Sequence, residues 1–483
     1  MNFIKHYTSQ VLSLGIEKKE LWRSVLFLSI VYAVAFIALF RADYTYLDDI
    51  ERSVMSIGLR GDFSRHISQF LSYFIHATVD ERLTDISPLS QIISCILLAT
   101  AGFMVVKIMC GKPTLYLLLA TLPIGLSPNF LGCMSFKFDA PYMALSVLAS
   151  VFPFLFMHRN HWLFLGISVI SLLIMLMTYQ ASSGIFIMIV LYFFFRTILS
   201  KSDSIKNAFR FIGISCASFI AALILFRLFF LQIIDSYAST NIELNFSIFT
   251  VFGSNWTMYW QLIRKDWNVL WQIIALVIVV IFYIKTIIHS KQNKIVAFFV
   301  TTLFLILLAL SVFGVYPLLA EPSFVPRAMY GIGILLAILS VDICFSLKKI
   351  YSFPVVLLVW CFFVFSFAYG NCLADQKRYK EFRAQILMHD IAQIIPTTQI
   401  HKIIIHNGIG FSSVVQNVAH NNPIVKRLIK PSLSRNYLAY YHNFPQLEQN
   451  EKAVSNEKEI PVVLDSFYHT IQLNDEYIVI TLK

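Results

Sequence analysis

Long apolar runs separated by short polar stretches dominate the chain. Eleven runs come close to the roughly 17 to 25 residues that a membrane-spanning helix needs. They lie near residues 24–40, 88–106, 114–127, 140–157, 162–178, 184–199, 211–231, 269–286, 295–314, 328–346 and 353–370. The pattern predicts a polytopic α-helical membrane protein with about eleven transmembrane helices. At the short run 114–127 and the tight turn Tyr179–Ser183, a re-entrant pair could replace two crossings.

Basic residues concentrate in every second loop, and the only acid in those loops is Asp203. The basic residues are Lys107, Lys112, Arg159, Arg196, Lys201, Lys206, Arg210, Lys285, Lys291, Lys294, Lys348 and Lys349. Because cytoplasmic loops are rich in Lys and Arg, we expect a cytoplasmic amino terminus and a periplasmic carboxyl terminus. Residues 1–23 alternate apolar residues and lysines at roughly helical spacing, which predicts a cytoplasmic amphipathic segment rather than a signal peptide.

The composition changes after Gly370. Residues 375–395 have the pattern of a helix that ends before Pro396, and Lys402–His406, Ile460–Asp465, His469–Leu473 and Tyr477–Leu482 alternate like short strands. We therefore expect a transmembrane domain over residues 24–370 and a small periplasmic α/β domain over 371–483. No Gly-rich phosphate loop, HExxH or G-x-S-x-G motif marks that domain as an enzyme in its own right.

Composition agrees with the membrane prediction. The chain of 483 residues is 58% hydrophobic and 13% charged, and its mean hydropathy is +0.70, which is outside the usual range of soluble globular proteins. The seven cysteines show no C-x-x-C spacing, so no disulfide framework or zinc site is expected. The net charge of +11 reflects the basic loops, and we expect no nucleic-acid partner.

The polar segment 41–87, between the first two apolar runs, has the densest carboxylates in the chain. It carries eight acidic residues, five arginines and no lysine. Asp48, Asp49 and Arg52 are spaced so that a helix beginning there presents them on adjoining faces. After Gly58 and Gly61, a second amphipathic helix with Arg65 at its start is expected to lie in the membrane interface. The segment could be the floor of an active site, or a solvated loop whose charges only keep it out of the bilayer.

Three further outer segments carry candidate residues. Lys137 and Asp139 flank the mouth of the fourth run, where charges often serve only as anchors. Tyr179 and Gln180 occupy an outer turn, and Glu321 and Arg327 an outer loop. Arginines are less common on the outer side of a membrane protein, so the position of Arg327 favours a phosphate or carboxylate partner. The aromatic stretch 232–268, which includes Trp256, would suit an interfacial belt or sugar rings.

These residues together resemble a known family. Tyr46–Ser53 after the first run, Arg65, Lys137–Asp139 before a later run and Tyr179–Gln180 are similar to motifs of the phage-associated Gtr-type serotype-converting O-antigen glucosyltransferases (the glucosyl transferase II family). The resemblance covers residues 24 to about 200 and fades toward the carboxyl terminus. The family motif has an aromatic residue and a Gly-Arg pair where this chain has Ile50 and Ser64-Arg65.

The resemblance implies a membrane glycosyltransferase of the GT-C type in the bacterial inner membrane. Such enzymes take glucose from undecaprenyl phosphate-glucose and add it to a sugar of the lipopolysaccharide O-antigen on the periplasmic face. They work beside a separate donor synthase and flippase. The donor is a lipid, so neither a cofactor nor a nucleotide-sugar motif is required, although a divalent metal is not excluded.

The chemistry of the residues agrees with this implication. Transfer from a lipid phosphate needs a carboxylate to take the proton of the acceptor hydroxyl and cations to stabilise the departing phosphate. Asp48 or Asp49 would be the base of an inverting displacement. We favour Asp48, because Arg52 lies one helical turn after Asp49 and is expected to pair with it. The predicted phosphate-binding residues are Arg52, Arg65, Lys137 and Arg327, and the predicted substrate-binding residues are Asp139, Tyr179, Gln180, Glu321 and Trp256.

Two other functions share the membrane pattern. A transporter or flippase of lipid-linked sugar should carry charges near the midplane of several spans, whereas the polar groups here gather at one face. An O-antigen polymerase would be expected to concentrate its arginines in two large outer loops, whereas here the first loop dominates.

Overall fold

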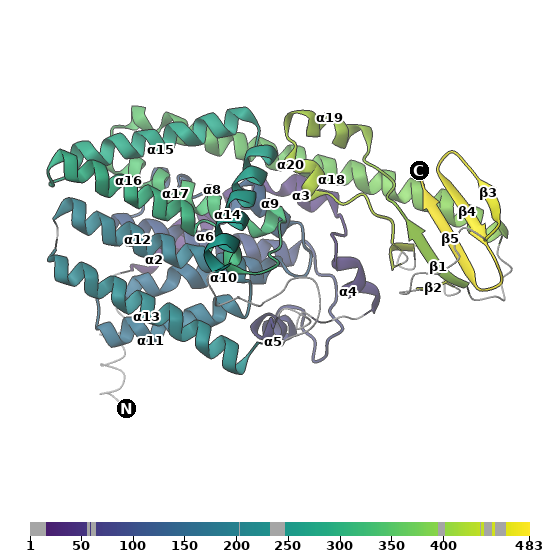
Figure 1. The fold of residues 1–483 in the computed structure, drawn as a ribbon, viewed down its shortest axis with the longest axis horizontal. Coiled ribbons are helices and arrows are strands. Elements are labelled where there is room, and N and C mark those ends of the chain that lie inside the picture. Colours follow the sequence, from purple (N-terminus) through teal and green to yellow (C-terminus); the bar gives the residue numbers. More distant parts are fainter. Residues whose placement is uncertain are drawn as a thin grey trace.

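The computed structural model describes residues 16–55, 58, 64–201, 203–231, 247–394, 401–434, 436–438, 447–449 and 460–483. Most of residues 1–23, predicted as an amphipathic segment, and Gly61, predicted as a helix breaker, lie outside them. The fold is mostly helical, with one small sheet at the end of the chain (Figure 1).

Six helices in the described ranges are long and apolar enough to cross a membrane. They are α6 (Leu89–Cys110), α12 (Ser183–Ser200) with η2 (Gln180–Ser182), α13 (Ile205–Phe229), α15 (Val269–His289), α16 (Lys294–Ser311) and α18 (Phe353–Ile394) with η5 (Lys349–Ser352). Shorter apolar helices pack among them: α10 (Ala140–Val151) with η1 (Phe152–Phe156), α11 (His161–Leu176) and α17 (Gly331–Ser346). The first apolar run forms α2 (Lys18–Ala35) and α3 (Ile37–Ala42). Every predicted run is therefore helical, but the structure supports six or seven crossings by length and composition, not eleven.

The third apolar run is bent. It forms α7 (Leu115–Leu119) and α8 (Pro123–Leu126), and the chain then turns by 69° into α9 (Pro128–Met134). The break falls at Ser127, whose backbone is extended with ψ 140°. A residue before proline is pushed out of the helical region by the proline ring, so the Ser127-Pro128 pair places the break. This geometry is that of a broken span or a re-entrant loop, the alternative expected for this run.

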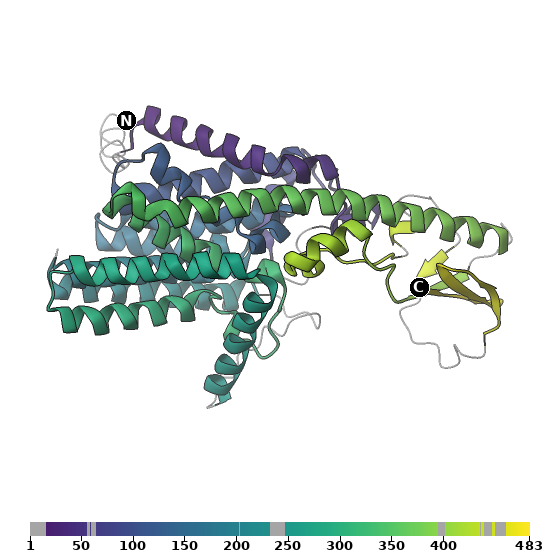
Figure 2. The ribbon, with the colours of Figure 1, turned by 90° about the horizontal axis from the view of Figure 1, so that it is seen from above.

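Both ends of the helix bundle carry polar connections. At one end Lys107 pairs with Glu20 at 2.9 Å, and the backbone N–H of Lys291 donates to the Leu199 carbonyl. This is the end with the basic loops. At the other end lie α4 (Asp49–Met55) and α5 (His66–Ile75) of the first polar segment (Figures 1 and 2).

The helix α14 (Ser247–Asp266) was not predicted. It leaves the bundle at a steep angle to α15 (Figure 2). Tyr259 and Ile263 are buried one turn apart, and Trp256 and Trp260 also face inward. This spacing is helical, but polar residues between the aromatics hid it from a search for long apolar runs. The short helices η3 (Tyr316–Leu318) and η4 (Pro326–Ala328) follow at the same end.

The carboxyl-terminal part contains a five-stranded sheet in the order β2-β1-β5-β4-β3. The strands are β1 (His401–His406), β2 (Leu447–Gln449), β3 (Val462–Asp465), β4 (His469–Leu473) and β5 (Tyr477–Leu482). β1 pairs in parallel with β2 and β5, and the β5-β4-β3 meander is antiparallel. Helices α19 (Ser413–Asn421) and α20 (Ile424–Leu428) lie between the sheet and the bundle (Figure 1).

The helix α18 joins the two parts. It runs without a break from Phe353 to Ile394, so the predicted domain boundary at residue 370 falls inside one helix. Its carboxyl-terminal half contributes Ala384, Leu387 and Ile391 to an apolar cluster with the sheet. A single rigid element therefore connects the membrane-like bundle with the sheet.

Candidate active site

Asp49 holds the first polar segment against the bundle. Its fully buried carboxylate accepts the backbone N–H of Tyr46 at 3.0 Å and that of Lys137 at 3.2 and 3.1 Å. The contact with the residue three positions earlier has the form of a capping-box carboxylate at the start of α4. Because Lys137 lies between α9 and α10, one side chain links the first segment to a distant connection.

Asp139 gathers two arginines. Its Oδ2 lies 3.0 Å from Nη2 of Arg52 and 3.5 Å from Nη1 of Arg65. The prediction that Arg52 pairs with Asp49 is wrong in its partner, because Arg52 forms an ion pair with Asp139. The physical reason is that the carboxylate of Asp49 turns back onto backbone N–H groups. Arg52 Nη1 also donates to the Gly58 carbonyl at 2.7 Å.

Asp48 and Asp49 occupy different environments. Asp48 is exposed, whereas Asp49 is fully buried. Burial raises the pKa of Asp49 well above its usual range, and the two backbone hydrogen bonds only partly oppose this. The nearby Asp139 carboxylate raises the Asp49 pKa further. The neighbouring acids are thus separated into one anchoring and one accessible carboxyl group.

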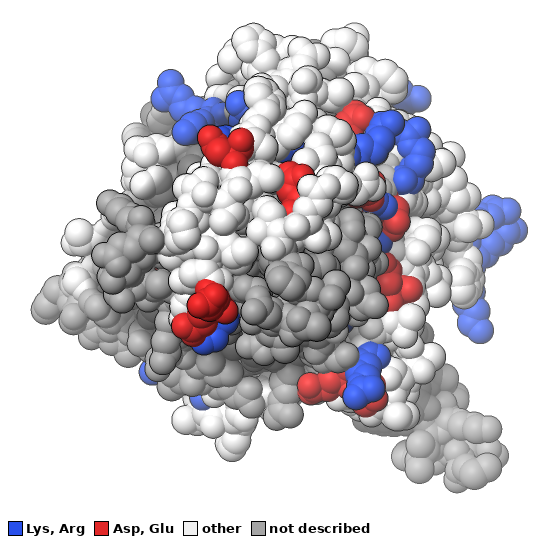
Figure 3. All heavy atoms as spheres, turned by 90° about the vertical axis from the view of Figure 1, so that its right-hand side faces the viewer, with Lys and Arg blue, Asp and Glu red and all other residues white. Residues whose placement is uncertain are grey.

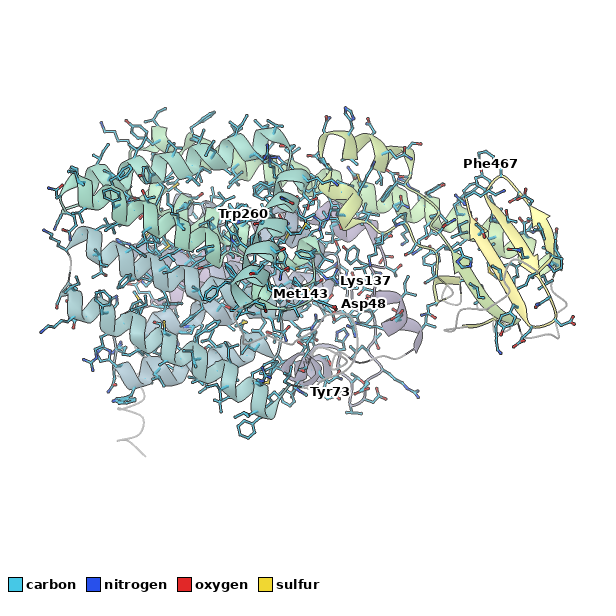
Figure 4. All side chains as sticks on the ribbon, in the orientation of Figure 1. Asp48, Tyr73, Lys137, Met143, Trp260 and Phe467 are labelled. Carbon is cyan, nitrogen blue, oxygen red and sulfur yellow. The ribbon has the colours of Figure 1, made fainter. Side chains whose placement is uncertain are left out.

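Lys137 contributes in a different way from the prediction. Its ammonium contacts the carboxylates of Asp43 and Asp85, and Asp43 also accepts from Lys377 of α18 at 3.0 Å. Burial disfavours the charged ammonium, but the two carboxylates outweigh it and raise the pKa of Lys137. Figure 4 shows Lys137 beside Asp48 at the end of the bundle. The Lys137 side chain therefore already has acidic partners, and its backbone N–H is what reaches Asp49.

Tyr179 contacts both Arg65 and Arg327. The guanidinium carbon of Arg65 lies 5.2 Å from the centre of the Tyr179 ring, and the Tyr179 hydroxyl donates to the Arg327 carbonyl at 3.4 Å. The Arg327 guanidinium lies over Phe136 at 5.5 Å. Two arginines from distant parts of the chain, Arg65 and Arg327, thus lie against aromatic rings at this place.

Eight of the predicted site residues gather at this place. Asp48, Asp49, Arg52, Arg65, Lys137, Asp139, Tyr179 and Arg327 form what we call the Asp139 cluster. Gln180 follows Tyr179 as the first residue of η2, partly buried. Glu321 is exposed. Trp256 donates to the Ala309 carbonyl of α16 at 3.2 Å, and no contact between it and the cluster is found in the described ranges.

Buried polar atoms without hydrogen-bond partners lie near Asp139. Among the described residues, Asp139 Oδ1, the Tyr142 hydroxyl and His76 Nε2 are buried and lack a hydrogen-bond partner. Such atoms are rare in folded proteins and call for a ligand or water. Sequence reasoning missed His76 and Tyr142. The signal for Tyr142 was its position three residues after Asp139, which places both on one helical face. The only signal for His76 was the presence of a histidine within the acidic segment.

His76 is arranged as a neutral acceptor. Its Nδ1 lies 2.7 Å from the Thr84 carbonyl and its ring stacks on Phe138 at 5.5 Å. A carbonyl only accepts, so Nδ1 carries the proton. Burial lowers the pKa of His76 although the Thr84 contact opposes this, so the ring is neutral near pH 7. Its Nε2 can then accept a hydrogen bond from a ligand hydroxyl.

The carboxyl-terminal part supports the first segment. Ile50 of α4 is buried in the same apolar cluster as Ala384 of α18 and Ile403 of β1. The Tyr46 hydroxyl donates to the Leu428 carbonyl at 2.6 Å. The surface at this end of the molecule intersperses acidic and basic side chains (Figure 3).

Comparison with known proteins assigns the family. The family model of the glucosyl transferase GtrII matches residues 37–338, which include the whole Asp139 cluster. The chain belongs to the GtrII glucosyl transferase family. This membership confirms the resemblance seen in the sequence and supports a glycosyltransferase role over transport.

One curated relative agrees with this assignment. It is an uncharacterized 55.3 kDa protein in the gtrB 5'region of Salmonella phage P22, 25% identical over 229 residues. The match covers 46% of this chain and 46% of the phage protein, so the chain spans about half the length of the relative it matches. No solved structure matches the chain.

Proposed function

We propose that this GtrII family member transfers glucose from undecaprenyl phosphate-glucose to a hydroxyl of an O-antigen sugar on the periplasmic face of the bacterial inner membrane. The observation that carries the proposal is the Asp139 cluster itself. It joins an accessible carboxylate, Asp48, with guanidinium groups at the polar end of an apolar bundle. Those are the groups that glycosyl transfer from a lipid phosphate requires.

Asp48 is the proposed base. The acceptor oxygen attacks C1 of glucose, the bond between C1 and the phosphate oxygen breaks, and the electron pair leaves with the phosphate. The acceptor proton passes to Asp48, and the single displacement inverts the anomeric centre. Asp49 fixes the backbone on which Asp48 is presented, because its own carboxylate is enclosed by N–H groups.

The arginines are the proposed phosphate site. Arg65 and Arg327 are partly buried; the Arg65 guanidinium lies over the Tyr179 ring and the Arg327 guanidinium over Phe136. Planar guanidinium groups bind phosphate oxygens in pairs, so they would stabilise the negative charge that grows on the departing phosphate. Asp139 keeps the Arg52 and Arg65 guanidinium groups in place between turnovers.

An apolar cavity offers a path for the polyprenyl chain. It has a volume of about 310 Å³ and lies between α10 and α11. Its lining residues are Leu145, Leu148, Ala149, Phe152, Ile167, Ile170, Ser171 and Ile174. α10 begins immediately after Asp139, and its first residue on the cavity wall is Leu145. A lipid whose phosphate sits at the cluster would lay its chain there.

The proposed orientation places the basic loops in the cytoplasm, where the amino terminus also lies. The Asp139 cluster and the sheet are then periplasmic, where they meet a donor supplied by a separate synthase and flippase. Mass spectrometry of O-antigen from cells with and without the gene tests the proposal. We expect an added hexose on the repeat unit, whereas a change in chain length alone would point to a polymerase.

A further inference from the structure

A polar cavity lies at the end of the bundle opposite the Asp139 cluster. Its volume is about 140 Å³, and residues of α12, α15, α16 and α17 form its wall. The polar side chains that matter here are Tyr192, Arg196, Ser200, Lys285 and Asp342. None of them takes part in the proposed transfer.

The charges in this cavity do not balance. Lys285 pairs with Asp342 Oδ2, and the Tyr192 hydroxyl donates to Asp342 Oδ1 at 2.8 Å. Asp342 is therefore already neutralised by Lys285. Arg196 forms no ion pair with a carboxylate of the described residues. Its Nη1 donates to the Tyr192 hydroxyl at 3.0 Å and to the Met109 carbonyl at 2.9 Å. One positive charge is left over.

A second observation points to a missing partner. The Ser200 hydroxyl oxygen is buried beside the cavity and has no hydrogen-bond partner in the part of the chain that the structure describes. A guanidinium group and a hydroxyl on the same helix, four residues apart, lie on one face. Together they present the donors that a phosphate oxygen accepts.

The surroundings suit a lipid headgroup rather than a soluble anion alone. Leu199, Phe282 and Phe304 form apolar walls of the cavity. The loops at this end carry Lys201, Lys291, Lys348 and Lys349, and basic pockets between helices on the cytoplasmic side bind anionic lipid headgroups. We propose that this cavity binds the phosphate of an anionic phospholipid from the leaflet at the basic end. The proposal is independent of the proposed transferase function.

Native mass spectrometry of the purified full chain tests this proposal, with phosphatidylglycerol, phosphatidylcholine or inorganic phosphate added in turn. We expect wild-type protein to retain phosphatidylglycerol in preference to phosphatidylcholine. Arg196→Gln should bind phosphatidylglycerol about tenfold or more weakly, because a hydrogen-bonded charge is lost. Arg210→Gln, an exposed arginine on α13 at the same end, is the matched control and should bind as wild type does.

A second variant is needed because Arg196→Gln also loses the hydrogen bond to the Met109 carbonyl and could misfold. Ser346→Glu adds a negative charge at the exposed mouth of the cavity and leaves the Arg196 contacts in place. It should weaken phosphatidylglycerol binding, while Asn207→Glu at an exposed position of α13 should not. Equal retention of phosphatidylglycerol by wild type, Arg196→Gln and Ser346→Glu would overturn the proposal. Binding of inorganic phosphate at Arg196 without any binding of phosphatidylglycerol would overturn a lipid as its source.

Discussion

Arg52 and Asp139 form an ion pair at 3.0 Å across 87 positions of sequence. The pair fastens α4 of the first polar segment to the start of α10, and Arg65 joins it at 3.5 Å. Both side chains of the pair are buried, so the interaction is shielded from solvent. Breaking such a pair leaves a buried charge without its partner, which is costly.

Removal of the Asp139 carboxylate should therefore affect both stability and donor use. In Asp139→Asn we expect a loss of about 3 kcal/mol or more of folding free energy, together with weaker donor use because Arg52 and Arg65 lose their common partner. Thermal unfolding of the protein in detergent measures the first effect. Asp80→Asn, at an exposed position of the same segment, should unfold as wild type does; a similar melting temperature for both variants would contradict the role of Asp139.

If Arg65 belongs to the phosphate site, Arg65→Lys should bind the lipid donor more weakly. Lysine keeps the charge but loses the two-pronged geometry of guanidinium. We expect a raised KM for the lipid donor with the protein still inserted, and the same for Arg327→Lys. Arg82→Lys, an exposed arginine of the same segment, is the control. Wild-type KM values in both Arg65→Lys and Arg327→Lys would remove these residues from the phosphate site.

The apolar cavity predicts a dependence on the length of the donor lipid. Ile170 lines the cavity and its side chain is 62% exposed, so Ile170→Trp should fill the cavity without disturbing the core. We expect slower transfer from undecaprenyl phosphate-glucose but little change with a short-chain donor. Ile220→Trp, at a position of α13 that is 56% exposed, should discriminate against neither donor. An equal effect of Ile170→Trp on both donors would place the lipid elsewhere.

Because the carboxyl-terminal part supports Tyr46, we expect a small loss of folding free energy in Tyr46→Phe. That change removes the hydroxyl bond to the Leu428 carbonyl and should cost about 1 kcal/mol. Because Tyr46 lies beside Asp48, turnover should fall as well. Tyr73→Phe, in α5 of the same segment, is the control in thermal unfolding and transfer assays. No change in either property for Tyr46→Phe would argue against support through Leu428.

The burial of Asp49 predicts a pH dependence. Its pKa is raised on folding, so the folded chain keeps a proton that the unfolded chain loses near pH 3.9, the approximate pKa of an unperturbed Asp. The stability from that proton is present below about pH 3.9 and is lost as pH rises through the raised pKa. The melting temperature of wild type should therefore fall relative to Asp49→Asn as pH rises from about 4. A difference that stays constant with pH would contradict the burial of this carboxyl group.

Sequence reasoning singled out the first polar segment but not the contacts that its side chains make. The density of acids and arginines identified the first polar segment, and the amphipathic spacing of Ile67, Phe70 and Phe74 correctly predicted α5. The ion pair between Arg52 and Asp139 could not be predicted, because two residues 87 positions apart meet only through tertiary packing. Helical spacing alone predicted an ion pair between Asp49 and Arg52. In the structure the Asp49 carboxylate instead accepts hydrogen bonds from backbone N–H groups.

The limits of pattern reading are also visible in the fold. The strands β1, β4 and β5 lie where period-two alternation predicted them, within one residue. The count of eleven spans is not confirmed, because apolar composition does not distinguish a crossing from a shorter apolar helix or from one that bends at Ser127-Pro128. The sequence pattern also did not predict that α18 is continuous. A change from apolar to charged composition resembles a domain boundary even where the backbone stays helical.

The most direct measurement is glucosyl transfer by purified Asp48→Asn in nanodiscs that contain undecaprenyl phosphate-glucose and an O-antigen acceptor. The change preserves size and removes the proton acceptor from an exposed position, so folding should be unaffected. We expect the rate to fall by roughly 10²- to 10⁴-fold at a wild-type melting temperature, while Asp80→Asn retains the wild-type rate. Full transfer by Asp48→Asn at normal protein abundance would contradict the account and place the base elsewhere in the cluster.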